Sequence, residues 1–199
     1  MNRYEIKFDI SEYKIFKIIK EYQLKELHPE RIIKSIYFDT INYSYFIDSE
    51  EGQTPRKKIR LRSYNLDKSQ SLELKFTNSY HREKIVINNF IFSNENISRE
   101  VRKFNIYDLI QPKLLVSYTR QYFLSAIGRI TIDKNIKYQK VNNKLNTIGA
   151  PISDHKTILE VKTQKTNFDK SEILKFINLQ ESRNSKYCNG VNLFNEKFK

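Results

Sequence analysis

Hydrophobic and charged residues alternate in six short stretches of the chain. Alternation with a period of two is typical of β-strands, in which successive side chains point to opposite faces. Each stretch therefore predicts a strand with one apolar face, carrying residues such as Ile6, Leu74 and Val161, and one charged face. The charged faces hold Arg3, Glu5 and Lys7; Lys58, Arg60 and Arg62; Glu73 and Lys75; Arg82 and Lys84; Arg129, Thr131 and Asp133; and Glu160 and Lys162.

The same patterns along the whole chain predict strands interrupted by three helices. Apolar residues at helical spacing predict a helix from Ser11 to about Leu27, a second over 97–110 that Pro112 ends, and a third from Asp169. The third helix has Ile173, Leu174, Phe176 and Ile177 on its apolar side. Strands are predicted over 3–9, 32–39, 43–49, 56–64, 71–76, 82–92, 113–124, 128–133, 136–141 and 156–163, and a short closing segment begins at 185–187.

This order of elements favours an α+β fold. We expect a closed antiparallel eight-stranded β-barrel, with flanking helices that cover the outer apolar face of its strands. The chain of 199 residues is long enough to bury a core. No linker, repeat or low-complexity tract divides it, so a single domain over residues 1–199 is predicted.

The alternation does not say which face of the strands lies inside. A half-buried strand normally turns its apolar face to the core and its charges to water. Here, however, the charges are mostly Arg and Lys accompanied by a lone Glu, whereas solvated faces usually mix both signs with Ser and Thr. If the strands close with their charges inward, the shared surface suits a polyanionic phosphate chain and its metal.

Composition limits the classes of partner. A net charge of +13 and a pI near 9.6 predict attraction to polyanions, whether nucleic acid, an anionic membrane surface, or nucleotide and polyphosphate. The single cysteine, Cys188, excludes an internal disulfide and fits a reducing compartment. The three histidines, His28, His81 and His155, lack ligand spacing, so any metal would be held by oxygen. Without an apolar run of membrane-span length or a signal-peptide core, a soluble cytoplasmic protein with no membrane span is expected.

Eight ordered motifs resemble the VTC domain, the polyphosphate polymerase domain of the vacuolar transporter chaperone complex, within the triphosphate tunnel metalloenzyme (CYTH-like) superfamily. The motifs cover nearly the whole chain. They are Arg-x-Glu-x-Lys at 3–7, Ser-Ile-Tyr-Phe-Asp-Thr at 35–40, Lys-Ile-Arg-Leu-Arg at 58–62, Leu-Glu-Leu-Lys at 72–75, Tyr-Thr-Arg at 118–120, Arg-Ile-Thr-Ile-Asp at 129–133, Leu-Glu-Val-Lys at 159–162 and Ser-Lys-Tyr at 185–187.

The resemblance implies a tunnel of eight antiparallel strands with inward-pointing basic residues. It further implies that Glu160 binds the metal, Mn²⁺ or Mg²⁺, and that Tyr118 lies near a nucleotide base. Glu5, Glu73 and Asp133 are further carboxylates expected at the site, with Asp133 in a supporting role. The implied phosphate-binding and catalytic cations are Lys7, Arg60, Arg62, Lys75, Lys84, Arg120, Arg129, Lys162, Arg183 and Lys186, with Arg183 standing where the family usually has Lys.

Three functions follow from the resemblance and the charge pattern. The leading hypothesis is a metal-dependent polyphosphate polymerase that transfers the γ-phosphate of ATP onto a polyphosphate chain. The runner-up is hydrolysis of inorganic triphosphate or nucleotide, and the third is a non-catalytic polyphosphate-binding module. Hydrolases of the superfamily typically open with Glu-x-Glu-x-Lys, whereas this chain has Arg3 at the first place, which favours the polymerase.

Two further residue classes have simpler interpretations. Nucleic acid is not expected as a partner, because most aromatic residues, such as Phe8, Phe16 and Phe104, occupy core-compatible positions rather than a stacking platform. Asp39 lies at a strand end before Thr40, where an Asp more often caps the following turn than takes part in catalysis.

Overall fold

A computed structural model describes residues 3–65, 67, 69–78, 81–164 and 170–194. Within these residues the strands form one sheet in the order β1-β9-β7-β6-β2-β3-β4-β5, and β8 pairs with β7. The chain divides into two compact units, each assembled from three segments. Unit 1 comprises residues 1–32, 117–137 and 153–185, and unit 2 comprises residues 33–116, 138–152 and 186–199. The single domain expected from the sequence remains a prediction.

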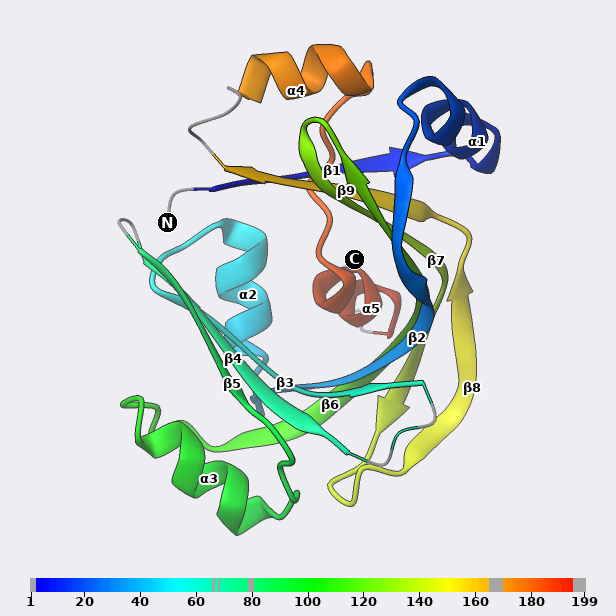
Figure 1. The fold of residues 1–199 in the computed structure, drawn as a ribbon. Helices are drawn as coiled ribbons and strands as arrows, with labels where there is room; N and C mark the ends of the chain where they lie inside the picture. Colours follow the sequence, from blue (N-terminus) through cyan, green and yellow to red (C-terminus); the bar gives the residue numbers. More distant parts are fainter. Residues whose placement is uncertain (1–2, 66, 68, 79–80, 165–169, 195–199) are drawn as a thin grey trace. The chain divides into compact units, whose positions relative to one another are not determined.

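Unit 1 is built around a short antiparallel sheet with β9 (Thr157–Gln164) between β1 (Arg3–Ile10) and β7 (Gly128–Val141). Val161 lies opposite both Ile6 and Ile130, so the apolar residues of the three strands share one face. Helices α1 (Glu12–Glu21) and α4 (Lys170–Ile177) cover that face with Ile15, Ile18, Ile173 and Ile177, as Figure 1 shows for α4. The other face of this sheet carries the charged residues.

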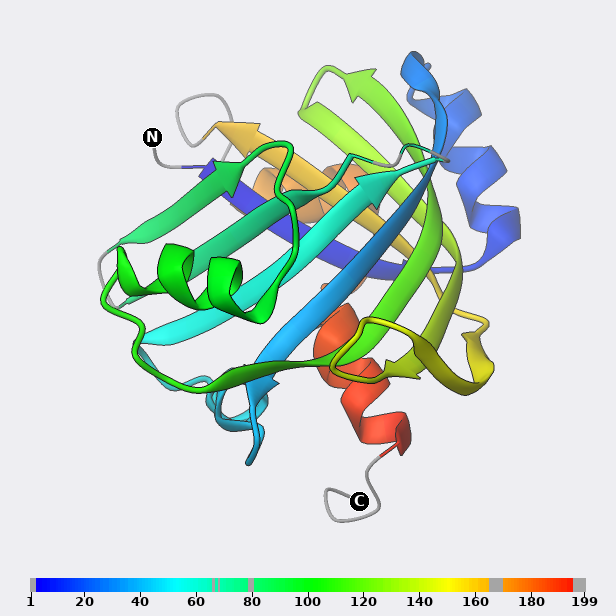
Figure 2. The same ribbon diagram turned by 90° about the horizontal axis from the view of Figure 1, so that it is seen from below.

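Unit 2 has a similar arrangement, built on other strands of the same sheet. The second half of β2 (Lys25–Thr40) pairs with β3 (Arg56–Tyr64), which is followed by β4 (Ser71–Thr77) and β5 (Arg82–Ile87). Leu61 lies opposite Ile36 and Leu72, and Ile59 opposite Phe38 and Leu74. Helix α3 (Asn94–Arg102) lies across this apolar face with Ile97 and Val101 (Figure 2). The remaining elements are α2 (Ser44–Glu51), β6 (Ile110–Ser125), β8 (Thr147–Asp154) and α5 (Lys186–Phe194).

Several predicted elements are confirmed, including the strands over 3–9, 56–64, 71–76 and 156–163. The predicted strand over 43–49 is wrong, because these residues begin α2. The carboxylate of Asp39 accepts hydrogen bonds from the backbone N–H groups of Tyr45 and Phe46, both at 2.9 Å. It thereby satisfies two donors of the first helical turn, which confirms that Asp39 caps the following segment.

Other boundaries differ from the predictions. The first helix stops at Glu21 rather than Leu27, because Gln23 has a positive φ of 46° and β2 begins at Lys25. The second covers 94–102 only, and Pro112 lies inside β6 instead of ending a helix. The two strands predicted over 128–141 are one strand, β7, while β8 was not predicted, because its residues are mostly exposed and do not alternate. The side chains of Arg3 and Phe176 and the predicted helix start at Asp169 lie outside the described residues.

The α+β class and the antiparallel pairing are as predicted, but the closed eight-stranded barrel is not. The observed strand order has two ends, β1 and β5, among the described residues. Side-chain alternation specifies which residues share a face, whereas closure depends on hydrogen bonds between the first and last strands, which alternation leaves undetermined.

Candidate functional site

The charged faces of the strands are largely buried, in both units. In unit 1 the exposed fractions are 5% for Glu160, 1% for Thr131 and 0% for Asp133. In unit 2 they are 5% for Glu73 and 6% for Arg62. A solvated outer face would leave such side chains in water, so the interpretation in which these charges point to solvent is wrong for Glu160, Asp133, Glu73 and Arg62. Buried charges require partners, and each unit supplies them in one cluster.

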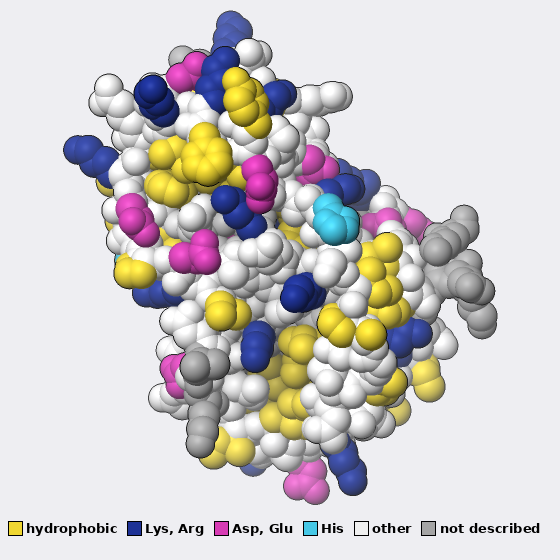
Figure 3. All heavy atoms as spheres, turned by 90° about the vertical axis from the view of Figure 1, so that its right-hand side faces the viewer, with side chains coloured by type: hydrophobic (Ala, Val, Ile, Leu, Met, Phe, Trp, Pro, Cys, Tyr) yellow, Lys and Arg dark blue, Asp and Glu magenta, His cyan; other side chains and the backbone are white. Residues whose placement is uncertain are grey.

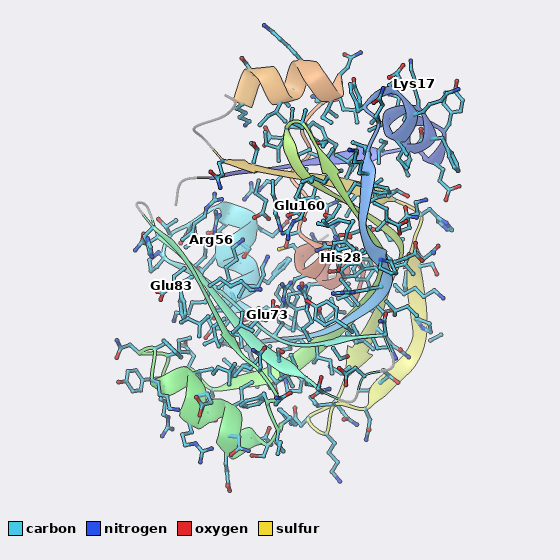
Figure 4. The ribbon with its side chains drawn as sticks, in the orientation of Figure 1. Lys17, His28, Arg56, Glu73, Glu83 and Glu160 are labelled. Carbon is cyan, nitrogen blue, oxygen red and sulfur yellow. The ribbon has the colours of Figure 1, made fainter. Side chains whose placement is uncertain are left out.

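The Glu160 cluster of unit 1 comprises Lys7, Arg120, Asp133, Glu160 and Lys162. Glu160 on β9 lies opposite Lys7 on β1 and Thr131 on β7. Its Oε1 is 2.7 Å from Lys162 Nζ, two residues along the same face, and its Oε2 is 3.8 Å from Arg120 Nη2. Figure 4 labels Glu160 on the side of β1 and β9 that faces away from α4.

Arg120 is fixed within this cluster by a two-pronged contact. Its Nε and Nη2 donate to the two carboxylate oxygens of Asp133 at 2.5 and 2.7 Å. The guanidinium carbon lies 5.3 Å from the ring centroid of Tyr118, which is 4% exposed. A bidentate pair of this kind sets the plane of the guanidinium, so Asp133 orients Arg120.

The loop after α4 also orders the cluster. Lys7 Nζ donates to the backbone oxygen of Asn184 at 2.8 Å, and the backbone N–H of Ser182 donates to the Lys7 carbonyl at 2.8 Å. Residues 182–184 therefore run beside β1 and hold the lysine ammonium next to Glu160.

The surrounding cations keep Glu160 ionised. Burial on its own would raise the pKa of this carboxyl, but the charges of Lys162, Lys7 and Arg120 outweigh burial and hold the pKa well below its usual range. The carboxylate is thus a permanent negative charge inside a group of positive ones.

The Glu73 cluster of unit 2 comprises Arg60, Arg62, Glu73 and Lys84. Glu73 Oε2 accepts hydrogen bonds from Arg60 Nε at 2.8 Å and Nη2 at 2.6 Å, and lies 3.6 Å from Arg62 Nη1. Its Oε1 accepts one from Lys84 Nζ at 3.0 Å. Burial would raise the pKa of Glu73, but Arg60, Arg62 and Lys84 lower it to about 2. Figure 4 labels Glu73 on the ribbon of this sheet.

Lysines extend the Glu73 cluster along the same face. Lys75 lies directly opposite Lys58 on one side and Lys84 on the other. Like charges opposite one another on a sheet repel, so these lysines add to the positive charge of this face.

The structure thus brings together nine of the predicted residues in two groups, one in each unit. These are Lys7, Arg120, Asp133, Glu160 and Lys162 in unit 1, and Arg60, Arg62, Glu73 and Lys84 in unit 2. Lys75 and Glu5 share the respective charged faces through their registers with Lys84 and Lys162. The remaining four are less closely grouped: Tyr118 is buried under Arg120, Arg129 and Arg183 are exposed, and Lys186 begins α5.

Sequence reasoning missed several side chains that complete these clusters. Tyr37 accepts a hydrogen bond from Arg60 Nη1 at 3.0 Å, and Ser35 Oγ accepts one from Arg62 Nε at 3.2 Å. Both stand at alternate positions of the 35–40 motif, so the register between β2 and β3 was the signal that would have found them. Asn184, next to the expected Arg183, carried no signal because it acts through its backbone oxygen.

The carboxylates fit a metal that is shared with a phosphate ligand. Both oxygens of Asp133 accept hydrogen bonds from Arg120, whereas Glu160 Oε2 lies 3.8 Å from Arg120 Nη2, beyond hydrogen-bonding distance. Among the described residues, no group of three or more His, Cys, Asp or Glu side chains is placed to hold an ion. Mg²⁺ typically binds one or two carboxylates together with substrate phosphates, so the donor set fits an ion that arrives with phosphate, not one held by protein alone.

A family model described as the VTC domain matches residues 2–195. The chain belongs to the VTC-domain family. This confirms the resemblance found in the eight motifs. A search of curated proteins found no match to this VTC domain.

Solved structures share the fold of this VTC domain at low sequence identity. A candidate adenylate cyclase from Bacillus halodurans is 13% identical with a TM-score of 0.58, over 98% of this chain and 99% of that one. A candidate adenylyl cyclase from Hippeastrum, described as having a dominant triphosphatase activity, is 14% identical with a TM-score of 0.55, over 96% of both chains. A hypothetical protein from Pyrococcus furiosus is 13% identical with a TM-score of 0.54, over 94% and 99%.

No helix in the described part of this VTC domain has both the length and the apolar composition that crossing a membrane requires.

Proposed function

We propose that this VTC domain is a phosphotransferase that moves the γ-phosphate of ATP onto a polyphosphate chain. The observation that supports this proposal is the pair of clusters in which a buried carboxylate is surrounded by three cations on the charged face of the sheet. Glu160 has Lys7, Arg120 and Lys162, and Glu73 has Arg60, Arg62 and Lys84. Such an excess of positive charge around each carboxylate is best neutralised by an anion with closely spaced charges.

The residue types suit phosphoryl transfer. This reaction asks little covalent chemistry of the protein, so positioning of the phosphates and neutralisation of developing charge lower its barrier. Arg60 and Arg62 stand two residues apart on one face and offer forked donors, while the lysines act as mobile point charges. We infer that these side chains exchange part of their contact with Glu73 for phosphate oxygens.

In the other unit, Glu160 is the residue proposed to hold Mn²⁺ or Mg²⁺ together with phosphate oxygens. When bound, such an ion neutralises phosphate charge. Arg120, oriented by Asp133, is then available as a donor to a phosphate through the N–H groups that Asp133 leaves unused. Lys7 and Lys162 keep Glu160 ionised and therefore able to bind a cation.

Transfer to a phosphate chain is favoured over hydrolysis for two reasons. The terminal phosphate of an acceptor is already largely ionised near neutral pH, so no strong general base is needed. The Arg3 at the start of β1 also replaces the first glutamate that is usual in the hydrolases. Hydrolysis of triphosphate is the second candidate, because the Hippeastrum protein of the same fold is described as a triphosphatase.

Nucleic acid is a less suitable partner for these cations. A nucleic-acid interface needs basic residues on an accessible surface, whereas Arg62 is buried and Arg120 is mostly covered, with side-chain exposures of 7% and 13%. On the face drawn in Figure 3, Lys and Arg are dispersed among acidic and hydrophobic side chains and form no continuous basic patch.

Product analysis tests the proposal. The protein is incubated with ATP, Mn²⁺ and a short polyphosphate primer, and the products are separated by gel electrophoresis and by nucleotide chromatography. We expect ADP to accumulate together with lengthening chains. Release of orthophosphate without chains, or cleavage of tripolyphosphate far faster than use of ATP, would show a hydrolase. No turnover with Mg²⁺, Mn²⁺ or Co²⁺ would leave a binding module.

A further inference from the structure

Tyr37 is a buried tyrosine on the charged face of β2 in unit 2. Only 4% of it is exposed, and its Cα partner on β3 is Arg60. Its neighbours along β2 that point the other way, Ile36 and Phe38, belong to the apolar core beneath α3. Tyr37 therefore places a titratable hydroxyl among the cations of the Glu73 cluster.

Two contacts fix the phenol ring. Arg60 Nη1 donates to its hydroxyl oxygen at 3.0 Å, and the Arg60 guanidinium carbon is 5.7 Å from the ring centroid. The ring of Tyr187 on α5 stacks against it with centroids 5.1 Å apart and an interplanar angle of 21°. Tyr187 is itself fixed, because its hydroxyl donates to Asp39 Oδ2 at 2.6 Å. The ring of Tyr37 consequently has little freedom to turn away from Arg60.

The hydrogen bonds of Arg60 place its guanidinium between Tyr37 and Glu73. Its Nε and Nη2 donate to Glu73 Oε2, and its Nη1 donates to Tyr37. A guanidinium carries its N–H donors in a rigid planar fork, so these three bonds fix the plane and the direction of the Arg60 side chain. Glu73 and Tyr37 together therefore set the orientation of the guanidinium.

We propose that Tyr37 is a positioning residue for Arg60: its neutral phenol aims the guanidinium at a bound phosphate, and its phenolate competes with that phosphate for the same cation. This inference rests on the proposed function, since it assumes that Arg60 binds a phosphate of the substrate. Through this role of Tyr37, the affinity for phosphate depends on pH within the physiological range.

The charges around Tyr37 support this role. Arg60, Arg62 and Lys58 face it from β3, with Glu73 behind Arg60 on β4; Tyr187 faces it from α5 and Asp39 follows it on β2. Burial would raise the pKa of the phenol, but the three β3 cations outweigh burial and lower the pKa to about 8. Above that pH the phenolate pairs with Arg60. If binding needs the neutral form, affinity for an anion falls about tenfold between pH 7 and pH 9.

Two measurements on wild type and Tyr37→Phe test the proposal, with Tyr13→Phe on α1 as the control because Tyr13 is 80% exposed. The first is the near-ultraviolet absorbance of phenolate during a pH titration without ligand. The second is calorimetric binding of tripolyphosphate at pH 7 and pH 9. Proton release by tripolyphosphate itself is common to all three proteins, so it cancels in the comparison.

We expect an absorbance step near pH 8 in wild type and in Tyr13→Phe that is missing in Tyr37→Phe. We also expect the fall in affinity from pH 7 to pH 9 to be about tenfold smaller in Tyr37→Phe than in the other two. A purely structural role would weaken binding equally at both pH values, and that result would overturn the inference.

Other outcomes separate this inference from the proposed function. If the absorbance of wild type shows no step near pH 8, the role of Tyr37 is overturned even if no variant folds. If Arg60→Gln leaves the step unchanged, Arg60 is not what lowers the pKa of Tyr37. If wild type shows the step but binds no tripolyphosphate at any pH, the proposed function fails, and the role of Tyr37 fails with it.

Discussion

Glu73 and Glu160 are the residues on which the charge of the two clusters depends. Each is 5% exposed, and each remains ionised because three cations outweigh the cost of burial. The free energy of unfolding therefore depends on the cations around each carboxylate and on the pH.

For Glu73 this dependence predicts acid sensitivity. Its pKa is about 2 in the folded protein against 4.5 normally, so its contribution to the free energy of unfolding is complete above pH 4.5 and is lost as pH falls toward 2. The shift corresponds to about 3 kcal/mol. Urea unfolding of wild type and Glu73→Gln at pH 6 and pH 3 measures it. The wild type should lose more stability than the variant, and equal losses would contradict the assignment.

For Glu160 the expected effect is on turnover. Glu160→Gln keeps size but removes the charge proposed to hold the divalent ion, so activity should fall at least about 100-fold, while metal-free tripolyphosphate binding survives or tightens. Titrating activity against Mn²⁺ measures the metal requirement. Glu100→Gln on α3 serves as the control, because Glu100 pairs with the exposed side chain of Lys103. Metal dependence equal to wild type in Glu160→Gln would remove Glu160 from the site.

At the scale of elements, the alternation of apolar and charged residues predicted a strand correctly where one face packs in a core and the other carries charges. The strand with Arg60 and Arg62 was predicted over the residues that β3 occupies, because Ile59 and Leu61 pack under α3 on its other face. The helix at 44–51 was not predictable from local pattern, since its first turn is stabilised by Asp39 from the preceding strand. Exposed β8 gave no alternation to detect.

The turn between β6 and β7 provides a test of unit 1. Gly128 has φ +122°, and a Cβ there would lie 2.5 Å from the backbone oxygen of Lys162 on β9. Gly128→Ala should therefore cost about 2 kcal/mol or more in the free energy of unfolding. Gly149→Ala on β8 is the control, because its φ is +70° but no atom lies within 4 Å of a Cβ. Thermal unfolding should rank Gly128→Ala below Gly149→Ala; the reverse order would contradict the close approach.

For the whole molecule, the family and the charged faces of the strands could be predicted from the sequence. The contacts that complete the two clusters could not. The eight motifs identified the VTC domain, which the family model confirms over residues 2–195. Burial of Glu160 and Glu73 decides the question of face that alternation left open. The Arg120 to Asp133 pair and the Tyr37 contact depend on the register between two strands, β6 with β7 and β2 with β3, which the alternation within one strand does not encode.

The central claim is that the buried charged faces, and not the outer surface, bind the polyanion. The most direct test is calorimetric binding of tripolyphosphate to the double variant Arg60→Ala, Arg62→Ala, compared with the double variant Arg99→Ala, Arg102→Ala, which removes two exposed arginines of α3. Circular dichroism confirms folding of both. Loss of two charged hydrogen bonds should weaken binding by at least about 3 kcal/mol, more than about 100-fold, in the first variant, and barely in the second. Unchanged affinity in a folded Arg60→Ala, Arg62→Ala protein, or an equal loss in the α3 variant, would contradict the claim.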